Sequence, residues 1–221
     1  WLLRTRLRGP QLTELKAKSE LKRQSPYSWI LILLAALIAT YVSIGWNLRS
    51  RVLVGNNDFV AFYTAARMVW DGKGSQLYDL REQTAYQEGI LSVLDTQFRF
   101  RDGLLAYNHP PFEILWYIPL GGLTYPQAYC VWLAVSLTCM IAGIALLLRF
   151  PGTLDRRHLA QYFLGSLAFF PVFVNLLQGQ DSATLFLFWA LGYWNLVRSR
   201  EAAAGVWLSF LLQKFQVLLP S

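Results

Sequence analysis

The first apolar run of the chain lies at residues 27–46 and reads YSWILILLAALIATYVSIGW. About 20 consecutive apolar residues in a helix are enough to cross the roughly 30 Å hydrocarbon core of a bilayer. Aromatic residues lie at both ends of the run, as is common where a helix meets the two lipid–water interfaces. The stretch therefore predicts a transmembrane helix.

The composition extends this prediction to the whole chain. Of 221 residues, 55% are hydrophobic and only 15% are charged, whereas a soluble domain has about 25% charged residues. A soluble globular domain is therefore excluded, and so is disorder, which requires low hydrophobicity. Further apolar runs predict four more spans, at residues 128–148, 159–177, 183–197 and 202–219. We expect an all-α, polytopic transmembrane helix bundle.

Charge predicts the orientation of this bundle. Residues 1–26 carry seven Lys or Arg against two Glu, which is typical of a cytoplasmic flank that contacts anionic lipid. With the N-terminus in the cytoplasm, residues 47–127 form a large outer loop. The basic connections at 149–157 and 198–200 then lie on the cytoplasmic side, as the positive-inside rule requires.

That topology depends on the apolar stretch at residues 112–123. Twelve helical residues rise only about 18 Å, which is too short to cross the bilayer. If the stretch did cross, both later basic connections would lie outside. We therefore expect an interfacial or re-entrant segment.

Two amphipathic helices are expected in the outer loop, at the membrane surface. In the first, Asn57 or Asp58 can cap the start and Gly72 fits the end. In the second, Asp79 and Glu82 have the spacing of a capping box.

Polar residues gather on the outer face in this topology. They are Asn56–Asp58, Asn108–His109 with Glu113, Gln178–Asp181, and Lys214 in the outer half of the fifth run. Carboxylates, a histidine and a lysine on one face can transfer protons and bind an anion. Each also has a structural explanation, because Asp58 and Asp181 can cap helices, His109 and Glu113 can begin a short helix, and Lys214 can reach the interface.

Other function classes lack their motifs. The sequence has no phosphate-binding GxxxxGK[ST], no dinucleotide GxGxxG and no GxSxG nucleophile motif. Its two cysteines, Cys130 and Cys139, are about 13 Å apart on a helix, too far for a disulfide, and match no metal motif. The basic N-terminal segment precedes an apolar run, which favours a membrane over a nucleic-acid partner.

Three segments resemble those of the GT-C superfamily of membrane glycosyltransferases, and most closely glycosyltransferase family 87. They are NDFVAFYTAARMVWDGKGSQLYD (57–79), YNHPPFEILWYIPLGGL (107–123), and GQDSATLFLFWAL with AGVWLSFLLQKFQ (within 179–216). One departure is the His-Pro-Pro at 109–111, where the family often has Tyr-Pro-Pro; a similar His-Pro-Pro occurs in protein mannosyltransferases of the superfamily. Family members are longer, so the resemblance implies that residues 27–221 are the N-terminal part of a GT-C-like catalytic module.

The resemblance implies an inverting transferase that moves a sugar, typically mannose, from a polyprenyl-phosphate carrier to a lipid-linked or other acceptor at the outer face of the cell membrane. Asp58 matches the position of the general base. We expect the substrates to contact Asn57, Tyr63, Arg67, His109, Gln180, Asp181 and Lys214. The donor is a co-substrate, no further cofactor is expected, and no ligand set indicates a metal.

Two alternatives stay open at this point. One is a non-catalytic multi-pass protein that binds or transports lipid. The other is a related transferase that uses a different carrier-linked hexose or pentose.

Overall fold

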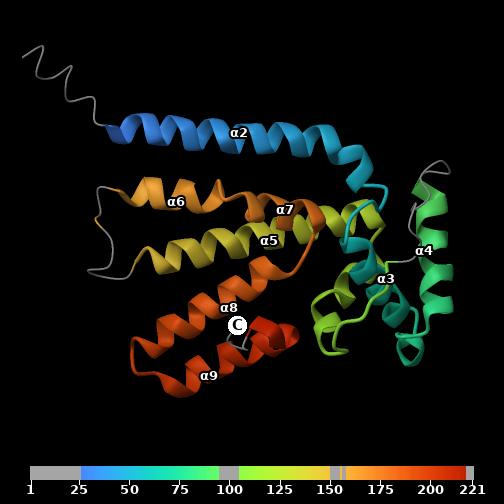
Figure 1. The fold of residues 1–221 in the computed structure, drawn as a ribbon. Helices are drawn as coiled ribbons and strands as arrows, with labels where there is room; N and C mark the ends of the chain where they lie inside the picture. Colours follow the sequence, from blue (N-terminus) through green and yellow to red (C-terminus); the bar gives the residue numbers. More distant parts are fainter. Residues whose placement is uncertain (1–25, 95–104, 150–154, 156–157, 218–221) are drawn as a thin grey trace, which may run out of the picture.

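The computed structural model describes residues 26–94, 105–149, 155 and 158–217, and all regular structure in these residues is helical. Figure 1 shows α2, α5, α6 and α7 alongside one another, with α8 and α9 below them and α3 and α4 at one end. The predicted all-α class is thereby confirmed. The basic segment at 1–25, Arg156, Arg157 and the end of the fifth apolar run lie outside the described residues.

Two of the predicted spans form long apolar helices. Helix α2 runs over Pro26–Val52 and α5 over Tyr125–Leu147. The apolar window of α2 is not buried at all within the protein, and that of α5 is 28% buried. Exposed side chains on so apolar a helix are suited to lipid rather than water, so both helices are suited to cross a membrane.

The third predicted span is not straight. It consists of α6 (Leu159–Leu167) and α7 (Phe170–Gln178), which are bent by 46°. Pro171 lies in the first turn of α7 and Phe169 before it is extended, because proline cannot continue the hydrogen-bond ladder of the preceding helix. If the bent pair counts as one span, the described part of the chain has three candidate spans.

The fourth and fifth predicted spans form shorter helices than expected. Helix α8 (Ser182–Leu196) has 15 residues, a rise of about 22 Å. Helix α9 (Glu201–Ser209) continues into the 3-10 segment η5 (Phe210–Val217), and its apolar part ends at Leu212. Helix α8 packs between α5 and α9. Neither α8 nor α9 reaches the length of a bilayer crossing, so the five-span arrangement is not confirmed.

The predicted outer loop, residues 47–127, contains α3 (Phe59–Trp70), η1 (Gly74–Gln76), α4 (Leu80–Leu94), η2 (Glu113–Trp116) and η3 (Ile118–Gly122). The stretch at 112–123 therefore forms short 3-10 turns, which pack against α3, and not a spanning helix. This agrees with the expectation from its length.

Helix α3 is more deeply buried than its pattern predicts. The predicted amphipathic helix would bury one face, yet nine of its twelve residues are buried. Six of the nine belong to the main core, together with Tyr117 between η2 and η3 and with aromatic residues of α5. Its end is as predicted, because Gly72 adopts a φ of 79°. The capping box predicted at the start of α4 forms only in part. Asp79 Oδ1 accepts hydrogen bonds from the amides of Arg81 and Glu82, but the Glu82 carboxylate bonds to Lys73 and the Asp79 amide donates to the carbonyl of Gln76.

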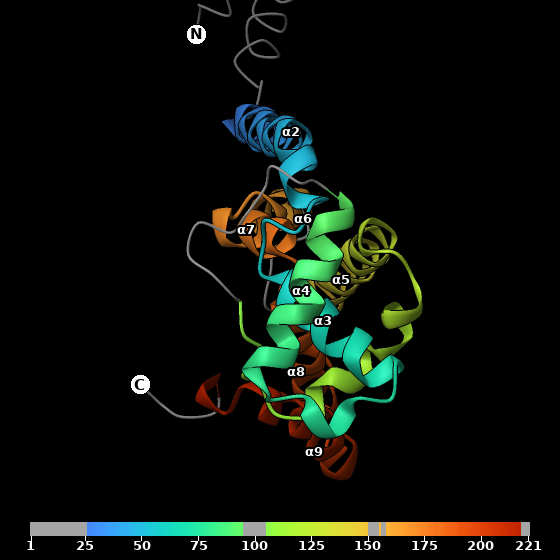
Figure 2. The ribbon, with the colours of Figure 1, turned by 90° about the vertical axis from the view of Figure 1, so that its right-hand side faces the viewer.

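The two ends of the bundle differ in character. Figure 1 places α3, α4 and the α7–α8 turn toward one end, while the end of α5, the start of α6 and the α8–α9 connection lie at the other; Figure 2 looks at the first end, with α3 and α4 in front. Arg149 follows α5, and Arg198 and Arg200 lie between α8 and α9. The separation is the one that the predicted topology requires, and which end faces the cytoplasm stays a prediction.

We expect Gly179→Ala to lower the stability of the fold by more than about 1 kcal/mol. Gly179 has a φ of 67°, and a Cβ there would lie 2.7 Å from Cβ of Phe59. Gly205→Ala is the matched control, because a Cβ on this α9 residue meets no described heavy atom within 4 Å and alanine favours helix. Thermal unfolding in detergent measures both variants, and an unchanged midpoint for Gly179→Ala would contradict the docking of this turn on α3.

Candidate active site

Asp58 is fixed by the turn between α7 and α8. Its Oδ2 accepts a hydrogen bond of 2.7 Å from Gln180 Nε2, and its backbone N–H donates one of 3.2 Å to Gln178 Oε1. Asp58 occupies the N-cap position of α3, but its side chain makes no capping hydrogen bond. The carboxylate is thus directed to a residue 122 positions away rather than to its own helix.

The turn itself is held by α5. Trp132 Nε1 donates to the carbonyl of Gly179 at 2.9 Å, and the Tyr129 hydroxyl donates to the carbonyls of Leu176 and Leu177. The left-handed φ of Gly179 ends α7 and reverses the chain. Residues 178–181 therefore reach Asp58 because a glycine and two α5 side chains fix their path.

His109 is positioned by a buried carboxylate. Its Nδ1 lies 3.1 Å from Oε2 of Glu113, whose side chain is fully buried. The ring also packs against Phe62 and Tyr107, at centroid distances of 4.9 and 5.5 Å. The contact to Glu113 occupies Nδ1 and leaves Nε2 as the nitrogen that can contact a ligand.

Burial raises the pKa of Glu113 above its ordinary value, and the negative charge of Asp181 acts in the same direction. The hydrogen bond to His109 and the nearby Lys214 oppose this rise. In addition, Glu113 Oε1 and Asp181 Oδ2 are buried without a hydrogen-bond partner among the described residues. A buried polar group without a partner is costly. Both oxygens therefore remain able to accept a hydrogen bond or a proton.

Lys214 forms an ion pair with Asp181. Asp181 occupies the N-cap position of α8 but makes no side-chain capping bond, so the capping explanation fails for it as it does for Asp58. The side chain of Asp181 is 2% exposed and that of Lys214 21%. The buried carboxylate thus holds the ammonium group at the edge of the protein interior.

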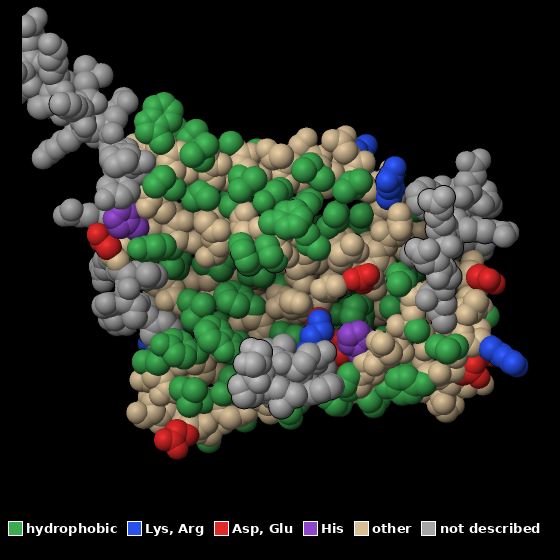
Figure 3. Space-filling view, in the orientation of Figure 1, with side chains coloured by type: hydrophobic (Ala, Val, Ile, Leu, Met, Phe, Trp, Pro, Cys, Tyr) green, Lys and Arg blue, Asp and Glu red, His purple; other side chains and the backbone are tan. Residues whose placement is uncertain are grey.

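These residues surround one small cavity. Asp58, His109, Gln180 and Lys214 line a space of about 140 Å³, together with Ala61 and Phe62 of α3 and the backbone region at 105–106. Figure 3 shows histidine, basic and acidic side chains close together in a hollow of an otherwise mostly apolar face. Four residues that the sequence suggested as site residues therefore meet, and Asp181 joins them through Lys214.

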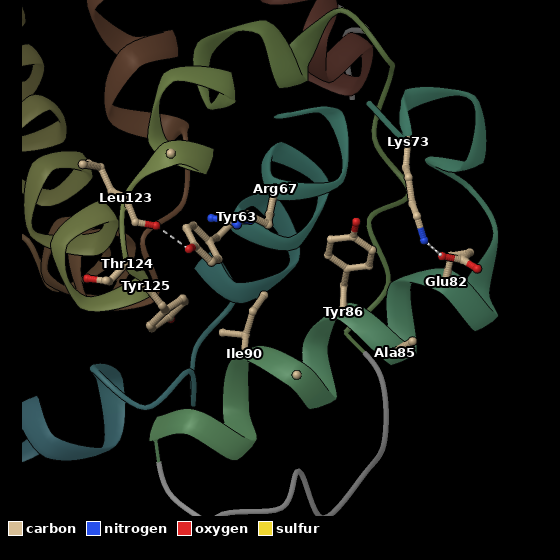
Figure 4. A pocket seen from close by; sticks show the side chains of 12 residues that line it. Tyr63, Arg67, Lys73, Glu82, Ala85, Tyr86, Ile90, Leu123, Thr124 and Tyr125 are labelled. Carbon is tan, nitrogen blue, oxygen red and sulfur yellow. Dashed lines mark hydrogen bonds and ion pairs between the residues drawn. The ribbon is translucent and has the colours of Figure 1, made fainter. Parts of the chain in front are cut away.

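Three suggested residues do not reach this cavity. Asn57 is buried and accepts a hydrogen bond from the Tyr125 hydroxyl. The Tyr63 hydroxyl donates to the carbonyl of Leu123, and Arg67 bonds to Asp71 and to the carbonyl of Gly121. Tyr63 and Arg67 line a second, larger pocket on the other side of α3 (Figure 4).

Glu113 was noticed in the sequence as part of an outer polar cluster but not assigned to the site. The signal was its spacing of four residues from His109, which is the distance of a side-chain pair on one helical face. Gln178 was also missed as the acceptor for the Asp58 amide. Among the described residues, no group of three or more His, Cys, Asp or Glu is arranged to hold a metal ion.

We expect the protein to lose stability relative to Glu113→Gln as the pH rises above about 4.5, the ordinary pKa of a glutamate. A raised pKa means that the folded state binds this proton more tightly than the unfolded state. The stabilising contribution of the Glu113 proton is therefore fully present below the ordinary pKa. It is lost as the pH rises from that value through the raised pKa of the folded state. Unfolding midpoints of both proteins at pH 4.5 and 8 measure the difference, and a constant difference would contradict the assigned shift.

One comparison with known proteins found a match. Residues 107–214 match the model of Glycosyltransferase family 87. No curated protein and no solved structure matches the chain. The matched segment begins two residues before His109, contains Gln180 and ends at Lys214, while Asp58 precedes it. The family resemblance expected from the sequence is thus confirmed over residues 107–214, and this match supports a membrane glycosyltransferase.

Proposed function

We propose that the protein transfers a sugar, most simply mannose, from a polyprenyl-phosphate donor to a hydroxyl group of a lipid-linked acceptor, with Asp58 as the general base. One observation carries the proposal: the Asp58 carboxylate lines the same cavity as His109 and Lys214. A base and two groups that can stabilise an anion are the parts that this reaction needs.

Asp58 is arranged to accept a proton. Gln180 donates to Oδ2, while Oδ1 receives no hydrogen bond from any residue that the structure describes. In the reaction, Oδ1 takes the proton of the acceptor hydroxyl as its oxygen forms a bond to C1 of the sugar. The bond from C1 to the phosphate oxygen breaks at the same time, and attack opposite to this bond inverts the configuration at C1.

The leaving group is a polyprenyl phosphate, which is already a stable anion and needs no strong acid. Its developing charge is stabilised by Lys214, which Asp181 holds in place, and by the Nε2–H of His109, in the tautomer whose Nδ1 accepts a hydrogen bond from the protonated carboxyl group of Glu113. Such fixed charges and donors cost no reorganisation at the moment of reaction. Asp181 and Glu113 are therefore positioning residues.

The surface beside the cavity suits a donor with a lipid tail. Phe112, Leu115 and Trp116 next to Glu113 are 44–63% exposed, and a carrier chain can cover such apolar side chains. The cavity itself, at about 140 Å³, is smaller than the roughly 300 Å³ of common ligand sites. We therefore propose that it encloses the reacting groups and widens when the sugar enters.

The predicted orientation completes the proposal. With the N-terminus and the basic connections in the cytoplasm, the cavity lies at the outer face of the cell membrane. The competing hypothesis is a multi-pass protein that binds or transports lipid without chemistry, for which the Asp58 carboxylate has no function.

We expect Asp58→Asn to reduce transfer from labelled polyprenyl-phosphate mannose by about 10²–10⁴-fold, because the amide cannot accept the hydroxyl proton. Asn keeps the size of the side chain, and the expression level and unfolding midpoint should stay close to those of the unmodified protein. Asp155→Asn is the matched control, because this exposed carboxylate lies in the α5–α6 connection at the other end of the bundle.

Unchanged transfer by Asp58→Asn would reject Asp58 as the base. If the unmodified protein transferred no sugar from carrier-linked mannose, glucose or pentose, this result would favour the lipid-binding hypothesis. Transfer from one of these donors in place of mannose would instead correct only the sugar.

A further inference from the structure

A second pocket is larger than the one at Asp58. It has a volume of about 710 Å³ and lies between α3, α4 and the start of α5. This volume is within the range of about 300–1,000 Å³ that is usual for small-molecule sites. Its lining shares no residue with that of the Asp58 cavity.

We propose that this second pocket binds neutral sugar residues of a saccharide-bearing acceptor. The assignment of the ligand to the acceptor rests on the proposed function, but the saccharide binding itself does not. Three features of the pocket support this ligand: its ion pairs, its tyrosine rings and its position relative to α3.

Both cations that line the pocket are paired with a carboxylate, and one of these carboxylates, that of Asp71, lies outside the lining. Arg67 Nε lies 3.2 Å from Asp71 Oδ2, and Lys73 Nζ lies 2.7 Å from Glu82 Oε2. An anionic ligand such as a phosphate would have to displace a carboxylate from each cation. A neutral ligand with many hydroxyl groups can donate to the carboxylates and accept from the cations without breaking either pair.

Aromatic rings supply the apolar part of the lining. Tyr63 and Tyr125 lie edge to face at 5.3 Å, and Tyr86 projects from α4 on the opposite wall (Figure 4). Such rings combine a large apolar face with a polar edge, which matches the C–H face and hydroxyl edge of a hexose. A hydrocarbon tail would instead remove the two ion pairs from water without offering them a hydrogen bond.

Helix α3 relates the two sites. Ala61 and Phe62 line the Asp58 cavity, whereas Tyr63 and Arg67 line the second pocket. At about 100° of rotation per residue, the two pairs point to roughly opposite sides of the helix. A ligand in the second pocket is therefore separated from the reacting groups by α3. This suits the anchoring of sugar units that are remote from the acceptor hydroxyl.

Gly89 provides a test that leaves the Asp58 cavity untouched. It lines the pocket from α4, and a Cβ built on it meets no described heavy atom within 4 Å. Gly89→Trp should fill the pocket, whereas Gly89→Ala adds one methyl group and serves as the matched control. Tyr86→Ala, which removes one ring, is an independent second variant.

The experiment is saturation-transfer NMR of mannotriose with the full chain in detergent. We expect a signal that Gly89→Trp and Tyr86→Ala each weaken at least about fivefold, equivalent to about 1 kcal/mol, and that Gly89→Ala and Asp58→Asn preserve. Inorganic phosphate should not compete. No signal, an unchanged signal in Gly89→Trp, or suppression by phosphate would each overturn the proposal.

Transfer assays distinguish a failure of the second-pocket proposal from a failure of the proposed function. With a glycolipid acceptor, Gly89→Trp should raise KM for the acceptor at least about fivefold and leave kcat near that of Gly89→Ala. If Asp58→Asn retained full transfer, the proposed base would be wrong, while the mannotriose signal would still decide whether the second pocket binds saccharide.

Discussion

The arrangement of the site depends on the contact between the α7–α8 turn and the start of α3. Two hydrogen bonds join Asp58 to Gln178 and Gln180, and Gly179 packs so closely on Phe59 that a Cβ would lie 2.7 Å away. Without this contact, Asp58 would belong to the outer loop alone. With it, the carboxylate faces residues that come from the second half of the chain.

The charged groups around the cavity are held in pairs. Lys214 is bound by Asp181, and His109 by Glu113. Removing one member of a buried pair is costly because it leaves the other uncompensated. The same pairing keeps the Lys214 ammonium group and the His109 ring in fixed positions, and fixed positive charges or N–H donors are what a departing phosphate requires. Stability and the proposed chemistry therefore rest on the same carboxylates, although neither carboxylate need contact the substrate.

Much of the helical framework could be predicted from the sequence because length and hydropathy are local properties. Helices α2 and α5 formed as expected, and Gly72 and Asp79 act as helix-end signals. The bend between α6 and α7 was not predicted, although Pro171 was a signal for it. The lengths of α8 and α9 were overestimated, since an apolar run does not show where turns and 3-10 geometry interrupt it.

The site was predictable only in part, for a physical reason. Polar residues at the same end of several helices were expected to gather, and Asp58, His109, Gln180 and Lys214 do line one cavity. The orientation of α3 could not be deduced, because it is buried on nearly every side and its apolar pattern selects no single face. Tyr63 and Arg67 were therefore grouped with Asp58, whereas the structure places them in the second pocket.

The most direct measurement of the central claim is a cryo-electron-microscopy structure of the full chain in lipid nanodiscs, bound to a polyprenyl-phosphate sugar donor. We expect the sugar C1 to lie beside the Asp58 carboxylate, with the phosphate against Lys214 and His109. Density for the phosphate at the opposite end of the bundle, near Arg149 or Arg198, would contradict it.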